Sequence, residues 1–217
     1  WMLTATGLVL LGSIKTGIAC VLAATVYGVG KTFYWPTMLA VVSERFPKGG
    51  ALTIGAMGGI GMLSAGILGG PALGYKQDYA ASNHLKELSP PTYERYVSET
   101  KRGLYGRVPE SAGLDGSKVA TIGDNGQQLA TELTNLTKGG RQPDPTTKML
   151  DGWWQTAKAT STEDRPKVTE SVLFGGQQAL RWTAYVPMAM AVLYLLLVLI
   201  FKARGGTPIW PSPWPGS

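Results

Sequence analysis

The chain has 217 residues, with 20 basic and 14 acidic side chains and a net charge of +6 at neutral pH. This excess of basic residues does not indicate nucleic-acid binding, because they are dispersed and form no stripe with interleaved aromatic residues. The single cysteine, Cys20, excludes an internal disulfide and a cysteine-based metal cluster. The single histidine, His84, is interpreted as a surface residue of a polar region.

The mean hydropathy of +0.04 is typical of a soluble protein, but it averages two unlike parts of the chain. Residues 1–75 and 183–201 are almost free of charged side chains, whereas residues 76–181 carry most of them. A soluble domain of this length has no room to bury three long apolar segments in one core. The sequence therefore predicts an all-α, polytopic membrane helix bundle with a large and mostly helical soluble insertion before the last span.

The N-terminal part predicts one partial and one complete membrane helix. Residues 1–12 are apolar but too short to cross a bilayer, which takes about 20 residues. We expect them to be the second half of a helix, followed by a turn at 13–17. Residues 17–42 are long enough to span with some tilt. Within them, Pro36 removes a backbone hydrogen bond and is expected to kink the helix.

A second complete span is predicted at residues 50–74, after a short polar connection at 43–49 that joins antiparallel helices. Small residues recur in this span four residues apart, which places them on one helix face where a neighbouring helix can pack closely. The packing stripe consists of Gly55, Gly59, Gly66 and Gly70. The alternative, a glycine-rich soluble loop, is disfavoured by the apolar residues between the glycines.

The polar insertion, residues 76–181, has four segments with helical patterns, separated by Gly, Pro and Asp breakers. These segments are 84–88, 91–102, 127–137 and 146–158. Core-forming residues are sparse, so we expect a small helical cap rather than an independent enzyme domain. The cap shows no nucleophile–base–acid arrangement. The sequence therefore predicts no enzyme activity, no cofactor and no metal site.

The last membrane segment, residues 182–204, is the clearest. It is mostly apolar, with Trp182 at one rim and basic residues at the other, and an amphipathic lead-in at 168–180 is expected to continue into it. Residues 205–217 have no packing pattern and are interpreted as a tail. Basic residues slightly favour a cytoplasmic C-terminus and a periplasmic or extracellular insertion, in a plasma or inner membrane.

Three stretches resemble the C-terminal half of major facilitator superfamily (MFS) transporters. They are Tyr27-Gly-Val-Gly-Lys-Thr-Phe-Tyr-Trp-Pro-Thr-Met-Leu39, Ser43-Glu-Arg-Phe-Pro-Lys-Gly-Gly50 and the glycine-rich segment ending in Gly69-Gly-Pro-Ala-Leu-Gly74. In that family, a proline-containing helix ten, a short basic cytoplasmic loop and a glycine-rich helix eleven follow one another. The resemblance implies that the four membrane segments are the end of helix nine and helices ten, eleven and twelve. The long insertion between helices eleven and twelve departs from the family's pattern.

Lys31 is the main candidate for solute binding. Near the middle of a span an ammonium group costs on the order of 3 kcal/mol, so such residues usually face a water-filled cavity or a partner. A cavity-facing Lys31 would bind an anionic or hydroxylated solute, and an ion pair with a carboxylate on another helix is the open alternative. Further candidates are Gly28, which permits close approach, and Thr32, Tyr34 and Trp35, which offer hydroxyls and aromatic faces. Helix packing or interfacial anchoring explains the two aromatic residues equally well.

Three residues are candidates for conformational change. Pro36 would help its helix to bend during transport, with a static kink as the alternative. The resemblance implies that Glu44 and Arg45 belong to an inner gate, with a solvated pair of charges as the alternative. The clear spans contain no Asp or Glu, so a coupling carboxylate would have to lie on helices outside this chain.

Two functions are predicted. The first is secondary active transport of a small organic solute, a sugar or an organic anion, by alternating access. The chain would then be part of a larger transporter whose N-terminal helices lie outside it. Its partners would be the lipid bilayer, the solute and those helices, with no nucleic acid. The second is a non-transporting membrane protein whose extracytoplasmic cap binds a partner.

Overall fold

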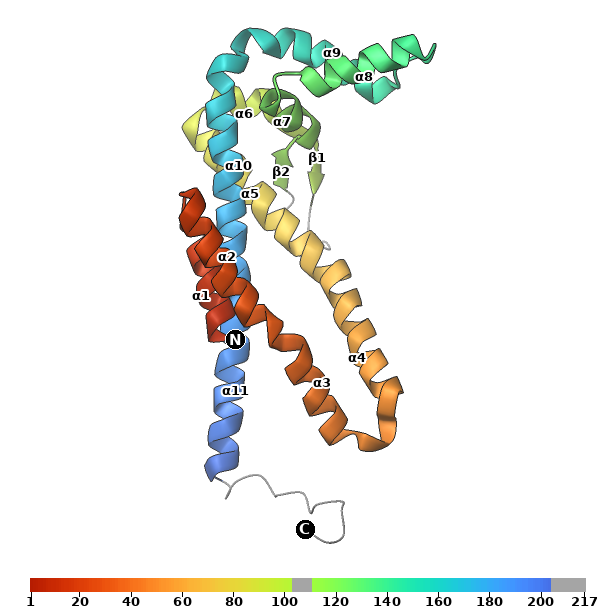
Figure 1. Ribbon diagram of the computed structural model, residues 1–217. Coiled ribbons are helices and arrows are strands. Elements are labelled where there is room, and N and C mark those ends of the chain that lie inside the picture. The colour runs from red at the N-terminus through yellow and green to blue at the C-terminus, as the bar shows by residue number, and fades with distance from the viewer. Residues whose placement is uncertain (103–110, 204–217) are drawn as a thin grey trace. The chain divides into compact units, whose positions relative to one another are not determined.

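The computed structural model describes residues 1–102 and 111–203 (Figure 1). This part of the chain is mostly helical, which confirms the predicted all-α class, and it contains one short pair of strands. It divides into two compact units. The first comprises residues 1–44 and 181–203, and the second comprises the described residues between 45 and 180. The predicted tail at 205–217 lies outside the described residues.

Helices of the first unit pack closely through glycine. The unit contains α1 (Met2–Leu11), α2 (Gly17–Thr32), α3 (Tyr34–Arg45) and α11 (Tyr185–Ala203). A Cβ on Gly7 of α1 would lie 2.6 Å from the backbone nitrogen of Tyr27, so only glycine permits this approach of α1 to α2. The helix expected over residues 1–12 and the non-helical turn after it are both present.

The kink expected at Pro36 is present as a break of one residue. α2 ends at Thr32 and α3 begins at Tyr34. Because proline has no N–H, Pro36 cannot donate to the carbonyl of Thr32, four residues earlier. The next residue restores the helical pattern, since the Thr37 N–H donates to the carbonyl of Phe33 at 3.3 Å. The apolar stretch 17–43 is therefore two helices in direct succession.

The same sequence pattern, Thr-x-Tyr-x-Pro, recurs at residues 183–187. There α10 (Ser161–Thr183) gives way to α11 after the single residue Ala184, three positions before Pro187. The Met188 N–H again donates to a carbonyl four residues earlier, that of Ala184, at 3.2 Å. The amphipathic lead-in expected at 168–180 is helical and leads into the final apolar helix through this second break.

The longest apolar helix of the second unit continues beyond its expected end. α4 (Gly50–Ser64), a π-helical turn (Ala65–Gly69) and α5 (Gly70–Leu88) form one helix of 39 residues. In the π turn the Gly70 N–H donates to the carbonyl of Ala65, five residues earlier, directly before Pro71. The helix expected over 50–74 is thus present, and the first part of the insertion extends it.

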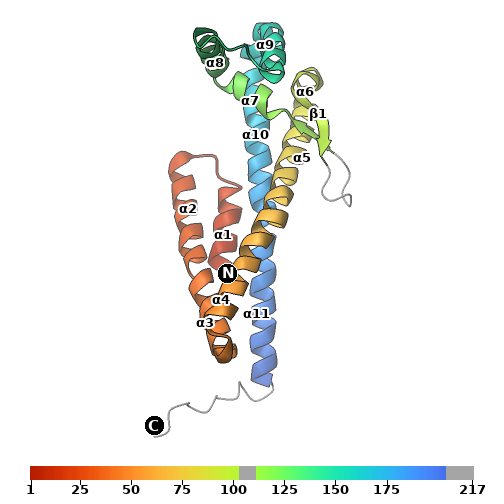
Figure 2. The same ribbon diagram turned by 90° about the vertical axis from the view of Figure 1, so that its right-hand side faces the viewer.

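Short helices and two strands complete the cap (Figure 2). The helices are α6 (Pro90–Tyr96), α7 (Gly116–Gly123), α8 (Gln127–Lys138) and α9 (Pro145–Ala157), and the antiparallel strands are β1 (Val97–Arg102) and β2 (Ser111–Leu114). The helices expected at 127–137 and 146–158 are confirmed. The expectation of a helix over 91–102 is wrong beyond Tyr96, because Val97 to Arg102 pair with β2 instead.

The cap has one apolar core to which six helices contribute. Its buried residues are Leu85, Tyr96, Ile122, Leu129, Trp154, Ala157 and Val168. Full burial of one such large side chain stabilises a fold by about 1.5–3 kcal/mol. The core residues are few, as the sequence suggests, but they come from every helix of the cap and join them into one packed body.

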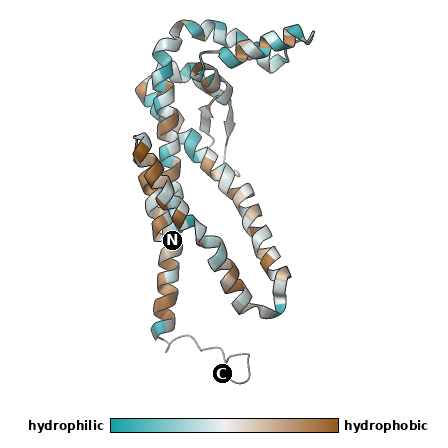
Figure 3. Ribbon diagram, viewed as in Figure 1, coloured by the Kyte–Doolittle hydropathy of each residue, from teal (hydrophilic) through white to brown (hydrophobic). Residues whose placement is uncertain are grey.

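Three helical stretches in the described part of the chain, each made of successive helices, are long and apolar enough to cross a membrane. They are Gly17–Ser43, Gly50–Leu88 and Pro145–Ile200. Figure 3 shows hydrophobic residues along α1, α2 and α11, whereas α8 and α9 are mixed. On α11, Leu195, Leu196 and Val198 are 57%, 49% and 60% exposed. Soluble monomers rarely expose continuous apolar surface of this kind, which is typical of helices that contact a membrane or a partner.

Candidate functional site

Lys31 lies in the last turn of α2, just before the break at Phe33. Its side chain is exposed, and its Nζ lies 5.8 Å from the centroid of the Tyr27 ring, within range of a cation–π contact. Among the described residues no carboxylate lies within ion-pair distance of this ammonium group. Lys31 is thus a cation on an apolar helix whose described neighbour is an aromatic ring.

Residues on one side of Lys31 face α1. Gly30 is buried there, because a Cβ on it would lie 2.5 Å from the hydroxyl oxygen of Thr4 and 2.7 Å from its backbone nitrogen. The hydroxyl oxygens of Thr4 and Tyr34 are also buried, and neither has a hydrogen-bond partner among the described residues. An unsatisfied buried hydroxyl costs about 1–3 kcal/mol. This side of the site therefore holds two hydroxyls that would gain from a bound water or solute hydroxyl.

Residues on the other side of Lys31 point outward. At about 100° per residue, Gly28 and Thr32 follow Lys31 around α2, and Trp35 lies on α3 after the break. The Thr32 hydroxyl donates to the carbonyl of Gly28 at 2.9 Å, so it bonds its own helix. Trp35 is 50% exposed, and a Cβ on Gly28 would meet nothing within 4 Å. The five predicted solute-binding residues thus lie on two successive helices, where the side chains of Lys31, Thr32 and Trp35 are exposed and the Tyr34 hydroxyl is buried.

Aromatic rings from three segments meet beside this site. The ring of Trp1 stacks on that of Tyr34, with centroids 3.8 Å apart, and on that of Tyr194, at 5.8 Å. The sequence interpretation missed Trp1, Thr4, Tyr27 and Tyr194. Only the contact of Tyr27 with Lys31 could have been predicted from the sequence, because residues four apart on a helix are neighbours. The others reach the site through contacts between segments far apart in the chain.

Of the predicted gating residues, the structure describes the side chain of Pro36 but not those of Glu44 and Arg45. Pro36 lies in the first turn of α3, three positions after the break. Glu44 and Arg45 belong to the last turn of α3, but their side chains lie outside the described residues. An inner gate formed by this pair stays a prediction.

The glycine packing stripe is exposed. A Cβ on Gly55, Gly59 or Gly66 would meet nothing within 4 Å, and one on Gly70 would meet only the carbonyl oxygen of Ala65, at 4.0 Å. Among the described residues of the second unit no helix packs on this face. A close-packing role for the stripe stays a prediction.

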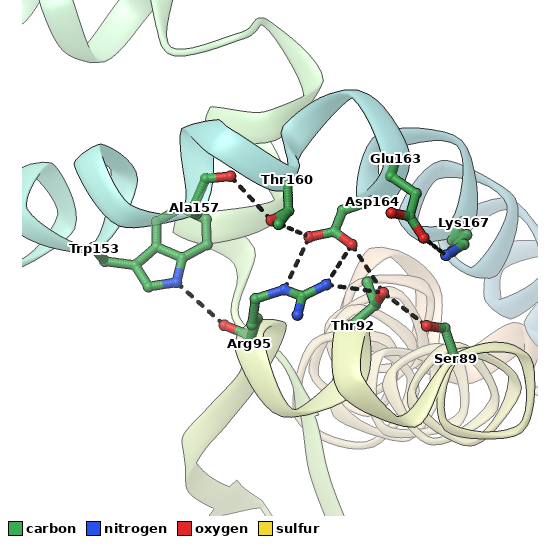
Figure 4. Close-up of polar contacts among 9 residues, drawn as sticks. All are labelled: Ser89, Thr92, Arg95, Trp153, Ala157, Thr160, Glu163, Asp164 and Lys167. Atoms are coloured by element: carbon green, nitrogen blue, oxygen red, sulfur yellow. Dashed lines mark hydrogen bonds and ion pairs between the residues drawn. The ribbon is translucent and has the colours of Figure 1, made fainter.

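The cap contains a buried ion pair, shown in Figure 4. The Asp164 carboxylate is fully buried and accepts hydrogen bonds from Arg95 Nε at 3.0 Å and Nη2 at 2.6 Å, and from the hydroxyls of Thr92 and Thr160 at 2.9 Å each. Burial raises the pKa of Asp164, but these hydrogen bonds outweigh burial and hold the pKa below its usual value. Because Thr92 and Arg95 lie on α6 and Asp164 lies on α10, the cluster links these two helices.

Two grooves flank α8 on the cap. One, of about 700 Å³, is lined by exposed polar residues such as Gln128, Glu132 and Arg141. The other, of about 470 Å³, lies between α8 and α9 beside Trp154. The described residues contain no group of three or more His, Cys, Asp and Glu side chains that could hold a metal ion. The grooves belong to the second unit and Lys31 to the first.

Comparisons with models of protein families, with curated proteins and with solved structures found no match.

Proposed function

We propose that this chain is part of a secondary transporter that moves a small organic solute across a membrane by alternating access, with Lys31 in the solute path. The observation that carries the proposal is the position of Lys31, an ammonium group without a described carboxylate partner on an apolar helix of membrane-spanning length. Such a charge is costly in the bilayer, on the order of 3 kcal/mol, unless it faces water, a partner or a ligand.

The chemistry around Lys31 supports an anionic or hydroxylated solute. The ammonium group provides charge and three hydrogen-bond donors. The buried hydroxyls of Thr4 and Tyr34 lack partners, and the half-exposed ring of Trp35 offers an apolar face. A sugar or a small organic anion would use all three kinds of contact.

The arrangement of the transporter follows from the resemblance to MFS proteins. The chain would supply the end of helix nine and helices ten, eleven and twelve, and the other wall of the solute cavity would come from further helices of the same protein. The two proline breaks, before Pro36 and Pro187, give two of these helices a place to bend. The cap would face the periplasm or the cell exterior.

The experiment that tests the proposal is solute uptake by proteoliposomes that contain the complete transporter. A panel of sugars and organic anions identifies the solute, and Lys31→Ala is then compared with Lys15→Ala, an exposed lysine in the turn before α2. Lys31→Ala should lower uptake at least about tenfold, because a hydrogen bond to a charged group contributes about 1.5–3 kcal/mol. Lys15→Ala should leave uptake unchanged.

Two results would overturn the proposal. One is uptake by Lys31→Ala equal to that of the unaltered protein. The other is a protein that inserts normally into the membrane but moves no solute of the panel, which would favour the second predicted function, a membrane protein whose cap binds a partner.

A further inference from the structure

Helices α5 and α10 cross at the base of the cap with their backbones in close contact. A Cβ on Gly175 of α10 would lie 2.6 Å from the carbonyl oxygen of Gln77 and 2.8 Å from the Cβ of Ala81, both on α5. Real Cβ atoms do not approach other atoms so closely, so the crossing depends on glycine at this position. Figure 2 shows the two helices crossing.

Side chains extend the contact towards the cap core. His84 of α5 makes a hydrogen bond of 3.1 Å through Nδ1 to the hydroxyl of Ser171, which is fully buried on α10. The His84 ring also stacks on that of Phe174, with centroids 4.3 Å apart. His84 was expected to be a surface residue, but in the structure it lies in this helix–helix contact. Leu85, the residue after His84, and Val168, about one turn before Ser171, belong to the core.

The crossing lies beyond the length of helix that a membrane needs. The helix Gly50–Leu88 has 39 residues, whereas about 20 are enough to cross the hydrocarbon core. The residues of α5 at the crossing, 77–84, belong to the polar second half of that helix. On the other side, α10 continues through Ala184 into the apolar α11. One candidate span therefore continues into α5 and another into α10, the two helices of the crossing.

We infer that this crossing is a clasp that holds the two helices together outside the bilayer, so that their outer ends move as a pair. The insertion between them is about a hundred residues long, and a flexible loop of that length would by itself constrain their separation only weakly. The clasp restores the constraint that a short connection would supply. The inference rests on the membrane placement in the proposed function, but it does not depend on transport.

Adjacent glycines on α10 make a matched test. Gly175→Ala places a methyl group into α5, whereas a Cβ on Gly176 would meet nothing within 4 Å. Both substitutions raise helix propensity by the same amount, so the difference between them isolates the contact. Nitroxide labels at Leu73 and Gln178, in a Cys20→Ser background, report the separation of α5 and α10 by pulsed electron paramagnetic resonance in lipid nanodiscs.

The clasp predicts a narrow distance distribution for the background protein and for Gly176→Ala. Gly175→Ala should shift or broaden it by about 1 Å or more, the displacement that relieves a 2.6 Å contact to an ordinary van der Waals separation. A broad distribution in the background, or equal distributions in the two variants, would overturn the inference.

If circular dichroism shows that Gly175→Ala does not fold, a second variant that adds no volume tests the clasp in its place. Ser171→Ala removes the hydrogen bond to His84 without adding volume, and exposed Thr169→Ala is its control. Ser171→Ala should broaden the distribution and Thr169→Ala should not, and identical distributions would contradict the clasp. If the unaltered protein moves no solute but still gives a narrow distance distribution, the proposed function alone would be refuted.

Discussion

The buried ion pair of the cap gives the sharpest stability prediction. Arg95→Ala leaves the Asp164 carboxylate, which is 0% exposed, with hydrogen bonds from Thr92 and Thr160 only. Removing one partner of a buried ion pair costs about 3–5 kcal/mol, because an uncompensated charge stays buried. The Arg95 side chain is 36% exposed, so water offsets part of that cost. We expect a loss of about 2–3 kcal/mol in the free energy of unfolding of the cap.

The assay is urea unfolding of the full chain in detergent, followed by tryptophan fluorescence. Trp153 is a suitable reporter because its Nε1 donates to the carbonyl of Arg95 at 3.2 Å. The control is Lys167→Ala, which breaks the surface pair with Glu163 and should cost under about 1 kcal/mol. A loss for Arg95→Ala no larger than that for Lys167→Ala would refute the reasoning.

The same pair predicts a dependence on pH. The pKa of Asp164 is lower in the folded than in the unfolded state, so the ionised carboxylate stabilises the fold. This stabilisation is fully present above the unfolded pKa of about 3.9 and is lost as the pH falls through the folded pKa. In Arg95→Ala the folded pKa is lowered less, so the acid loss of stability in that variant should be smaller.

Further predictions concern Tyr96 and the residues beside Lys31. Burial raises the pKa of Tyr96 to about 12, and its buried hydroxyl has no described partner. Tyr96→Phe should therefore keep the free energy of unfolding in urea or raise it by up to about 1 kcal/mol. It should also remove a loss of stability that the unaltered cap shows as the pH rises from about 10. Unchanged alkaline behaviour would contradict this. Gly30→Ala should lower thermal stability in detergent by about 1–3 kcal/mol through overpacking against Thr4, whereas Gly28→Ala, with open space, should not. Equal effects of the two substitutions would show that Gly30 is not a contact point.

Apolar length identified the long helices from the sequence, and local signals identified part of the cap. The helix at 145–157 is capped by Asp144, whose carboxylate accepts a hydrogen bond from the Thr147 N–H at 3.2 Å. An aspartate N-cap of this kind can be recognised from the sequence. The same signal at Asp115, which caps α7, was missed because the helix has only eight residues. The strand pairing of Val97 with Leu114 was missed because it joins distant residues and overrides a helical local pattern.

The sequence predicts the part of the candidate site that lies close to Lys31 along the chain, but not the contacts of that part with other helices. Lys31 stands out because a charge interrupts an apolar segment, and helical spacing then connects it with its near neighbours. That Gly30 rather than Gly28 meets another helix, and that Thr4 and Trp1 lie beside Tyr34, depends on the packing of α1 on α2. No local pattern encodes that contact.

The central proposal is that three helices cross a bilayer, with the cap on one side and the 43–49 connection on the other. Single cysteines at Gln128, Lys48 and Leu196, in a Cys20→Ser background, test it with a membrane-impermeant maleimide on sealed cells. Gln128→Cys should react in intact cells, Lys48→Cys only after permeabilisation, and Leu196→Cys in neither condition. Reaction of Gln128→Cys and Lys48→Cys from the same side, or ready reaction of Leu196→Cys, would contradict the account.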